Sequence, residues 1–488
     1  MISKNPRSRA AAGVFFMAAF LLSACQIIRP ETFLTPTFTA TATDIPNTLE
    51  PSVTPTSTET PLPPYLGLTP KDVDGIEIHV WHGQRDEVKK ELEFLTAKFN
   101  DENKYGIKVY LSAELSDIQL NDRILENSTG GELPDMVISD SHWLRLWQTE
   151  KIPLTNLEDY IGHPIYGFDA LDISPVMDLM LAQEKYNGIQ IGLPLWHNPA
   201  LLFYNTTWAK NLGFSNPPVT MNDFSEQICA AMDALNKDED VDNNGTGGWI
   251  LSTTTETLMS WLVNTAGVGS SLENFPQNTE SDTFLEISNW LRDLFDKGCV
   301  WQSRVSEPYD YFAQRYALLY SGSFSDIQLQ RRAFTDSKST GSDDWEVIAY
   351  PRMLDNGKLR EPQIYSSAVS VGIFTATAEE QFASWLFLSW LMKDENLIEL
   401  ALTAEGWPVQ DSQEVDRAFK ENANSKIYQS LNLRKYIRPL QLSADWNISS
   451  LVLADGFEHV FNASTPYDKI PDIWVQIQET LSEIINRN

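Results

Sequence analysis

The sequence has few cysteines, few histidines and a shortage of basic residues. Its 488 residues include three Cys and six His, and 36 Lys+Arg stand against 67 Asp+Glu, which gives a formal net charge of −31. Recognition of phosphates needs a basic face, so we expect no nucleic-acid partner. Because 42% of the residues are hydrophobic and 11% are aromatic, the chain is too rich in core-forming residues to be a disordered acidic tail.

Several motifs for metal binding and catalysis are also absent. No pair of cysteines has CxxC spacing, which excludes zinc-ribbon and thioredoxin-like sites. The sequence contains no His-Glu-x-x-His, no Gly-x-Ser-x-Gly and no phosphate-binding loop. We therefore expect no metal centre of these types and no catalytic residues.

The first apolar segment is too short to cross a membrane. Lys4, Arg7 and Arg9 precede an apolar run over residues 10–24, whereas a spanning helix needs about 20 apolar residues. A basic start followed by a short apolar run is typical of a secretory signal. The run ends at Leu-Ser-Ala-Cys (22–25), which resembles the lipobox of bacterial lipoproteins.

The lipobox resemblance implies that residues 1–24 are a signal peptide and that Cys25 carries acyl chains such as palmitate. A lipid of this kind holds a protein on a membrane without spanning it, so we expect the mature chain on the outer face of the cell membrane. The alternative is an ordinary secretory signal followed by a chance cysteine. Residues 25–72 are rich in Thr, Pro and Ser, a composition typical of an extended tether.

The two remaining cysteines, Cys229 and Cys299, leave two alternatives open. Outside the cytoplasm they could form one disulfide. Two separate thiols buried in a large core are an equally good interpretation, because free cysteine is among the most buried residue types.

An Asp-rich segment matches the first half of a calcium loop. Asp240, Asp242 and Asn244 supply oxygens at positions 1, 3 and 5, and Gly245 stands at position 6. Position 12 is Leu251 instead of the bidentate Glu. Calcium therefore needs a carboxylate from elsewhere, and a plain surface loop is the alternative; we expect no other cofactor.

From about residue 73 the chain alternates short strands with helices. The sequence predicts a strand over residues 76–80, a helix whose apolar stripe runs from Val88 to Phe99, and a second strand over residues 107–111. A further helix and a strand over residues 136–138 follow. This order predicts an α/β fold with a mostly parallel sheet flanked by helices.

Polar and aromatic side chains follow two of the predicted strands. Trp81 and His82 come after the first strand, and Ser139 and Asp140 come after the third. In open parallel sheets, ligands bind beyond the carboxyl ends of the strands. We therefore expect these four residues to meet at one edge of the sheet, in a binding site.

A series of motifs in the rest of the chain resembles one family. A Pro-containing strand runs into a Tyr-Asn pair (193–205), and Pro-Pro-Val-Thr-Met-Asn-Asp-Phe (217–224) opens a helix. A strand with a Gly turn (316–324), a return strand with an amphipathic helix (370–393) and Gly-Trp-Pro (406–408) follow. In this order and spacing the motifs resemble the extracellular solute-binding proteins of bacterial ABC importers, family 1, which includes the maltose-binding type.

The resemblance implies a two-lobed periplasmic-binding-protein-like fold of type II, with hinge crossings between the lobes. Lobe 1 is expected over residues 73–196 with 366–405 returning to it, and lobe 2 over residues 197–365 and 406–488. The expected protein is a monomer and not an enzyme. It would capture a mono- or oligosaccharide between the lobes and deliver it to the permease subunits of an ABC transporter.

The family's positions also imply a set of ligand-binding residues. Four of them are Trp, which favours carbohydrate because aromatic faces stack on sugar rings. The implied residues are Trp81, His82, Ser139, Asp140, Trp196, His197, Trp261, Ser323, Phe324 and Trp407. Two alternatives stay open: a surface glycoside hydrolase, whose paired carboxylates have no fixed spacing in sequence, and a ligand-sensing lipoprotein without a transport role.

Overall fold

A computed structural model of the chain describes residues 67–252, 254–265, 281–302, 308–336, 343–355, 357–421, 431–439 and 445–487. All of them belong to one compact unit, Leu62–Asn488. The expected signal peptide, Cys25 and most of the expected tether lie outside the described residues, so these predictions stay predictions. Within the described part, no helix is both long enough and apolar enough to cross a membrane.

Eleven strands of the described residues form one large sheet. Its main path runs through β2 (Lys108–Ala113), β1 (Glu77–His82), β3 (Met136–Asp140), β13 (Ile364–Ile373), β6 (Leu193–Asn205), β9 (Leu319–Ser323), β7 (Trp249–Leu251) and β8 (Val300–Gln302), in that order. Its first part, with the helices around it, makes lobe 1. The elements of lobe 1 are β1 Glu77–His82, α1 Asp86–Glu102, β2 Lys108–Ala113, α2 Asp117–Ser128, β3 Met136–Asp140, α3 Ser141–Thr149, α4 Glu158–Ile161, α5 Asp178–Gln183, β4 Lys185–Tyr186, β5 Ile189–Gln190, α12 Ala378–Leu391 and α13 Asp394–Thr403. β1 pairs in parallel with β2 and β3, which confirms the predicted β-α-β unit.

Helix α1 shows why the apolar periodicity predicts this lobe well. Its buried side chains include Leu92, Leu95 and Phe99, which recur at helical spacing and face the core. The ring of Phe99 packs edge to face on Phe387 and Trp390 of α12, with centroids 4.9 and 5.4 Å apart. Helices α12 and α13, distant in sequence, therefore complete the core of lobe 1 against α1.

The second part of the sheet makes lobe 2, in which β7 pairs in parallel with both β8 and β9. Its elements are α6 Thr206–Asn211, α7 Met221–Leu235, β7 Trp249–Leu251, α8 Thr255–Ser260, α9 Ser281–Asp296, β8 Val300–Gln302, α10 Tyr309–Ala313, β9 Leu319–Ser323, α11 Asp326–Asp336, β10 Trp345–Ile348, β11 Leu354–Asp355, β12 Lys358–Leu359, α16 Trp446–Val460 and α17 Ile470–Arg487. Helix α7 begins as its sequence predicts: Thr220 and Asp223 form a capping box, each side chain accepting from the other's backbone N–H.

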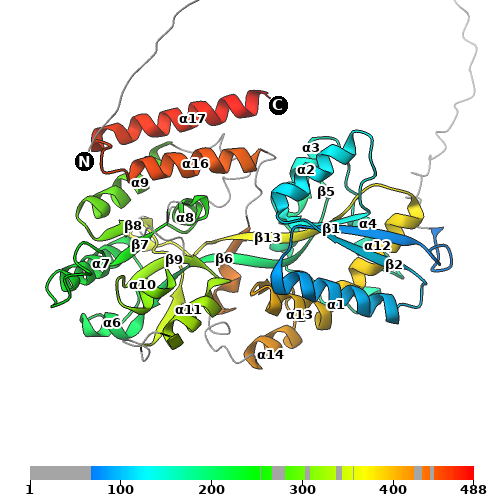
Figure 1. Cartoon of the computed structure of the whole chain (residues 1–488), viewed down its shortest axis with the longest axis horizontal. Helices are drawn as coiled ribbons and strands as arrows, with labels where there is room; N and C mark the ends of the chain where they lie inside the picture. The colour runs from blue at the N-terminus through cyan, green and yellow to red at the C-terminus, as the bar shows by residue number, and fades with distance from the viewer. Residues whose placement is uncertain are drawn as a thin grey trace, which may run out of the picture. The chain divides into compact units, whose positions relative to one another are not determined.

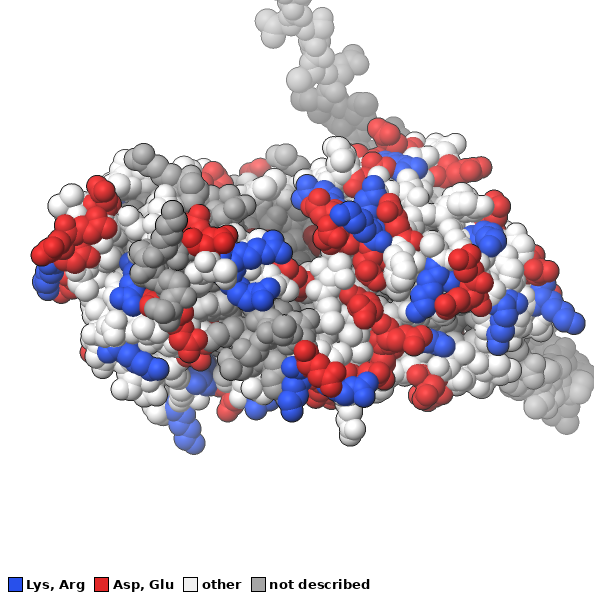
Figure 2. Space-filling view, turned by 60° about the horizontal axis from the view of Figure 1, so that its bottom comes forward, with Lys and Arg blue, Asp and Glu red and all other residues white. Residues whose placement is uncertain are grey.

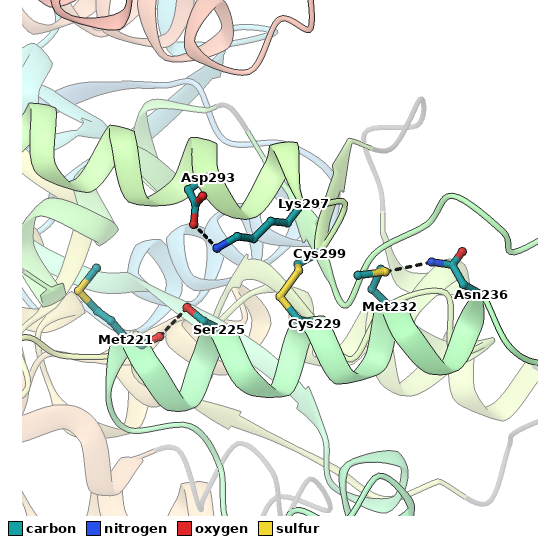
Figure 3. The surroundings of a disulfide bond; sticks show 8 residues. All are labelled: Met221, Ser225, Cys229, Met232, Asn236, Asp293, Lys297 and Cys299. Atoms are coloured by element: carbon teal, nitrogen blue, oxygen red, sulfur yellow. Dashed lines mark hydrogen bonds and ion pairs between the residues drawn. A yellow bond between two sulfur atoms is a disulfide. The ribbon is translucent and has the colours of Figure 1, made fainter. Parts of the chain in front are cut away.

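A disulfide joins Cys229 of α7 to Cys299, the residue before β8, with Cα atoms 4.6 Å apart. Figure 3 shows the bond between the helix that carries Met232 and Asn236 and the helix that carries Asp293 and Lys297. Of the two alternatives for these cysteines, the disulfide is confirmed. It fixes α7 to the end of α9 inside lobe 2.

Two long strands, β6 (Leu193–Asn205) and β13 (Ile364–Ile373), connect the lobes. Figure 1 shows them side by side between the lobe that contains β1 and the lobe that contains β7. β13 pairs antiparallel with β6 through Trp196, His197 and Asn198, and the next residues of β6 pair with β9. Because β6 pairs with strands of both lobes, the residues at its middle lie at the boundary between the lobes.

A third connection departs from the expected lobe boundaries. The short strand β14 (Trp407–Pro408) pairs with β6, and α14 (Gln413–Glu421) packs on α13 of lobe 1. The chain then crosses through β15 (Ile437–Pro439), which pairs with β13. Helices α16 and α17 pack on α8 and α9 of lobe 2. We expected the chain to return to lobe 2 at residue 406. This boundary is too early, because α14, which follows residue 406, packs on α13 of lobe 1.

The surface carries both signs of charge. On the face drawn in Figure 2, Lys and Arg side chains are interspersed among Asp and Glu. Many ion pairs of the described residues join residues three or four positions apart in the chain, such as Lys237 with Asp233. A surface of this kind with a net charge far from zero favours solubility.

Candidate functional site: a polar cavity between the lobes

A cavity of about 530 Å³ lies where the two lobes and the connecting strands meet. This volume is in the range of ligand pockets, roughly 300–1,000 Å³. The lining residues come from lobe 1, from the middle of β6 and β13, and from lobe 2. They are Gln84, Val88, Asp140, Trp196, Asn198, Ala200, Ser252, Thr254, Glu256, Thr257, Ser321, Gly322, Ser323, Ser325, Asp326, Tyr350, Tyr365, Ser367, Ala368, Val369 and Ala404.

The lining is rich in hydroxyl groups and carries charge of one sign. It includes five Ser, two Thr, two Tyr and the carboxylates of Asp140, Glu256 and Asp326. None of the described residues that line the cavity is Lys, Arg or His. A buried anion needs a cationic partner, so the lining disfavours phosphorylated and carboxylated ligands.

Trp196 stands at the centre of the site, on β6 opposite Val369 of β13. Its side chain is 5% exposed, and that edge faces the cavity. Behind it lies Gly406, where an added Cβ would overlap the indole ring. The close backbone approach of Gly406 therefore fixes the position of the ring. This contact gives a physical reason for the Gly of the Gly-Trp-Pro motif.

Asp140 lines the cavity from lobe 1. It lies at the carboxyl end of β3, where a ligand of a parallel sheet is expected to bind. Its backbone N–H donates to Asp117 (2.9 Å), the first residue of α2. Burial raises the pKa of Asp140 to about 7, and the charges of Asp117 and Glu256 add to this effect. No described residue donates a hydrogen bond to the side chain of Asp140, which lines the cavity.

Ser323 and Asp326 form the lobe 2 wall at the Gly322 turn. The carboxylate of Asp326 accepts hydrogen bonds from the Ser323 backbone (2.7 Å), from the Ser323 hydroxyl (3.2 Å) and from the Tyr309 hydroxyl (2.8 Å). A Cβ at Gly322 would come within 2.8 Å of Asp326 and within 2.9 Å of the Phe203 ring. The glycine therefore lets the turn close tightly, and Asp326 holds it.

Two residues that sequence reasoning missed complete the site. Glu256 lies in the first turn of α8 in lobe 2, and Tyr365 lies on β13. Tyr365 is 3% exposed, and its pKa is raised by burial and then by the charges of Glu256 and Asp140. The three side chains therefore lie within electrostatic reach of one another. No local motif marks Glu256 or Tyr365, because the packing of α8 on β6 and β13 brings the two residues to the same cavity.

The sequence matches the family model of the bacterial extracellular solute-binding proteins over residues 95–426. The chain belongs to this family. A comparison with curated protein sequences found no match.

Solved structures with the same fold agree with the two-lobed architecture of this solute-binding protein. The sugar-binding protein MalE from Xanthomonas citri has a TM-score of 0.66 at 15% identity, covering 84% of this chain and 100% of its own. The cyclic alpha-maltosyl-1,6-maltose binding protein from Arthrobacter globiformis has a TM-score of 0.64 at 17% identity, covering 83% and 98%. UgpB from Mycobacterium tuberculosis, solved with glycerophosphocholine, has a TM-score of 0.63 at 15% identity, covering 84% and 98%. At these identities the likeness shows the fold, and the predicted fold class is confirmed.

Of the ten ligand-binding residues expected from the sequence, Asp140, Trp196 and Ser323 line the cavity. Three others lie close in the chain to lining residues but are buried in the protein. His82 and His197 are 0% exposed, and burial lowers their pKa values to about 4 and about 3. His197 shares a hydrogen bond with Ser366 across the connecting strands (3.1 Å). Ser139, also 0% exposed, sits behind Asp140.

The remaining four expected residues pack against protein. Trp81 stacks under the guanidinium of Arg123, whose Cζ lies 3.5 Å from the ring centroid. Trp261 is fully buried in the core of lobe 2, edge to face with Phe224, Trp249, Trp290 and Tyr350. Phe324 and Trp407 are 1% and 0% exposed and pack edge to face on each other, 5.5 Å between centroids. These residues support the walls of the site and present no face to the cavity.

The Asp-rich segment of lobe 2 forms a surface turn. The Asp240 carboxylate accepts from the Asp242 backbone N–H (3.0 Å), and Asp238 accepts from the Asn243 side chain (2.9 Å). Asn244 is exposed. Across the described residues, no group of three or more His, Cys, Asp or Glu side chains is placed to hold a metal ion. Calcium binding at this turn stays a prediction.

Proposed function

We propose that this solute-binding protein captures a carbohydrate in the cavity between its lobes. The main support is the lining of that cavity, where the indole of Trp196 lies among hydroxyl, amide and carboxylate groups. Aromatic faces stack on the apolar faces of sugar rings, and polar groups bond the sugar hydroxyls. An amino acid would call for a basic partner to its carboxylate, and no described lining residue is basic.

The solved structures with this fold support the same choice. MalE and the cyclic alpha-maltosyl-1,6-maltose binding protein bind sugars. UgpB binds glycerophosphocholine, whose phosphodiester is anionic. Because three carboxylates line the cavity here, a phosphodiester is a poorer candidate than a sugar.

Closure of the two lobes over the ligand would create the form that the permease subunits of an ABC transporter recognise. A monomeric protein on a lipid-modified Cys25 would stay near that permease, on the outer face of the cell membrane. Because the family consists of binding proteins, we propose release of an intact sugar rather than hydrolysis.

Calorimetric titration of the full-length chain in mild detergent tests the proposal. Neutral mono- and oligosaccharides, amino acids and glycerophosphocholine are titrated in turn, and mass spectrometry checks that a bound sugar is recovered intact. We expect a sugar to bind, and Trp196→Phe to weaken that binding while Trp261→Phe, in the lobe 2 core, leaves it unchanged. Binding of an amino acid or of glycerophosphocholine with no binding of any sugar would contradict the proposal.

A further inference from the structure

Three polar side chains reach the cavity from three different parts of the fold. Asp140 comes from lobe 1, Glu256 from lobe 2 and Tyr365 from the connecting strand β13. Among the described residues, none donates a hydrogen bond to either carboxylate side chain or to the Tyr365 hydroxyl. Tyr365 is 97% buried by protein and lines the cavity, and the charges of Glu256 and Asp140 act on its hydroxyl. Asp140 is partly buried and Glu256 is exposed, so both carboxylates are open to a ligand in the cavity. Polar groups at a cavity that have no protein partner indicate where a ligand makes its polar contacts.

Within the described residues, only negatively charged groups act on Asp140 and Tyr365. Asp117 and Glu256 are the charged groups that act on Asp140, and both are acidic; Glu256 and Asp140 are the charged groups that act on Tyr365. The third carboxylate of the cavity, Asp326, already accepts from Tyr309 and Ser323. Asp140 and Glu256 therefore repel each other across the space between the lobes, with no cation of the described lining to offset them.

A ligand group that binds between Asp140, Glu256 and Tyr365 must donate several hydrogen bonds and carry positive charge. An ionised carboxylate accepts hydrogen bonds only, and a Tyr hydroxyl can also accept. An ammonium group has three N–H donors, which matches the three acceptors of Asp140, Glu256 and Tyr365. A sugar hydroxyl has one donor and leaves the repulsion between the carboxylates in place.

We propose that the cavity selects an amino-substituted carbohydrate, whose ammonium group lies between Asp140, Glu256 and Tyr365. The inference rests on the proposed function and names its substrate class. Because Asp140 and Glu256 belong to different lobes, the bound ammonium group also links the lobes by charge. The sugar ring itself packs at Trp196, on the wall that β6 forms.

Matched pairs of sugars test the inference, since the members of each pair differ at one position. The full-length chain is titrated by calorimetry with glucosamine and glucose, with galactosamine and galactose, and with β-1,4-linked oligomers of glucosamine and glucose of equal length. We expect the amino member to bind at least tenfold more tightly in the pairs that bind. Equal or tighter binding of the neutral members would overturn the inference and leave sugar capture intact.

Variants locate the preference within the cavity. Asp140→Asn and Glu256→Gln should each reduce the ratio of amino to neutral affinity at least fivefold. Glu226→Gln is the control, because Glu226 is exposed on α7 of the same lobe and does not line the cavity; it should leave the ratio unchanged. An equal effect of all three variants would show a general charge effect and contradict the site. Binding of putrescine without binding of any sugar would contradict the proposed function itself.

Discussion

The backbone of Gly406 lies directly against the indole of Trp196, so closely that a Cβ at position 406 would overlap the ring. The contact joins two crossings of the chain, since Trp196 belongs to β6 and Gly406 precedes β14. Trp196 is thereby held with one edge in the cavity between the lobes. The orientation of the central aromatic residue of the site thus depends on a glycine 210 positions later in the sequence.

Gly406→Ala should displace Trp196 and weaken ligand binding. Overpacking at a well-packed contact costs roughly 1–3 kcal/mol, and here the strain falls on the ring that faces the ligand. Calorimetry should show a lower affinity, and the tryptophan fluorescence spectrum should shift. The control is Gly67→Ala, because an added Cβ there meets nothing within 4 Å. Unchanged affinity in Gly406→Ala would mean that the position of Trp196 does not matter for binding.

Sequence patterns predicted the elements of lobe 1 because their causes are local. The stripe that contains Leu92, Leu95 and Phe99 faces the core as its spacing indicates. Asp140 lies at the cavity because it is at the carboxyl end of β3, which pairs in parallel with β1. The family resemblance correctly indicated the fold, and Thr220 caps its helix as the motif implies.

The other parts of the site depend on contacts between distant segments. Glu256 and Tyr365 reach the cavity through the pairing of β13 with β6 and the packing of α8 beside both strands. Trp261 and Trp407 look like ligand-binding aromatics in the sequence, but neighbours from distant elements cover them completely. The presence of a tryptophan in the sequence does not show which of its faces other segments of the protein will cover.

Removal of the disulfide should destabilise lobe 2. The bond between Cys229 and Cys299 closes a loop with a sequence separation of 70 residues, and loss of a native disulfide typically costs about 2–5 kcal/mol. Chemical unfolding of a Cys229→Ser/Cys299→Ser double variant should show this loss. A reducing agent should destabilise the wild-type protein and leave the double variant unchanged. If it affects both equally, the reductant acts elsewhere.

The pH dependence of stability should report on Asp140. Its pKa is about 7 in the folded protein, mainly through burial, against about 3.9 in an unfolded chain. The folded state therefore holds an extra proton between these values, and the stability that Asp140 contributes is present below about pH 4 and is lost as the pH rises through 7. Without ligand, Asp140→Asn should thus raise the melting temperature relative to wild type more at pH 8 than at pH 5. A difference that does not vary with pH would contradict the assigned pKa.

Replacement of Cys25 should release the protein from the membrane. Cys25→Ser removes the thiol to which the lipid would be attached, so the variant should leave the membrane fraction and appear in the soluble fraction. Labelling with a clickable palmitate analogue should mark wild type and fail to mark the variant. Retention of Cys25→Ser on the membrane would contradict the lipid anchor.

Hydrogen–deuterium exchange of the full-length chain, with and without its tightest-binding sugar, tests the central claim most directly. If the sugar binds between the lobes, protection should rise together in three segments: Gln84–Val88 of lobe 1, Trp196–Ala200 on β6 and Thr254–Thr257 at the start of α8 in lobe 2. The comparison region is a second hollow of about 360 Å³ beside α1 and α12, which Tyr105 and Trp390 line. Protection confined to that hollow, or to one lobe alone, would contradict capture between the lobes.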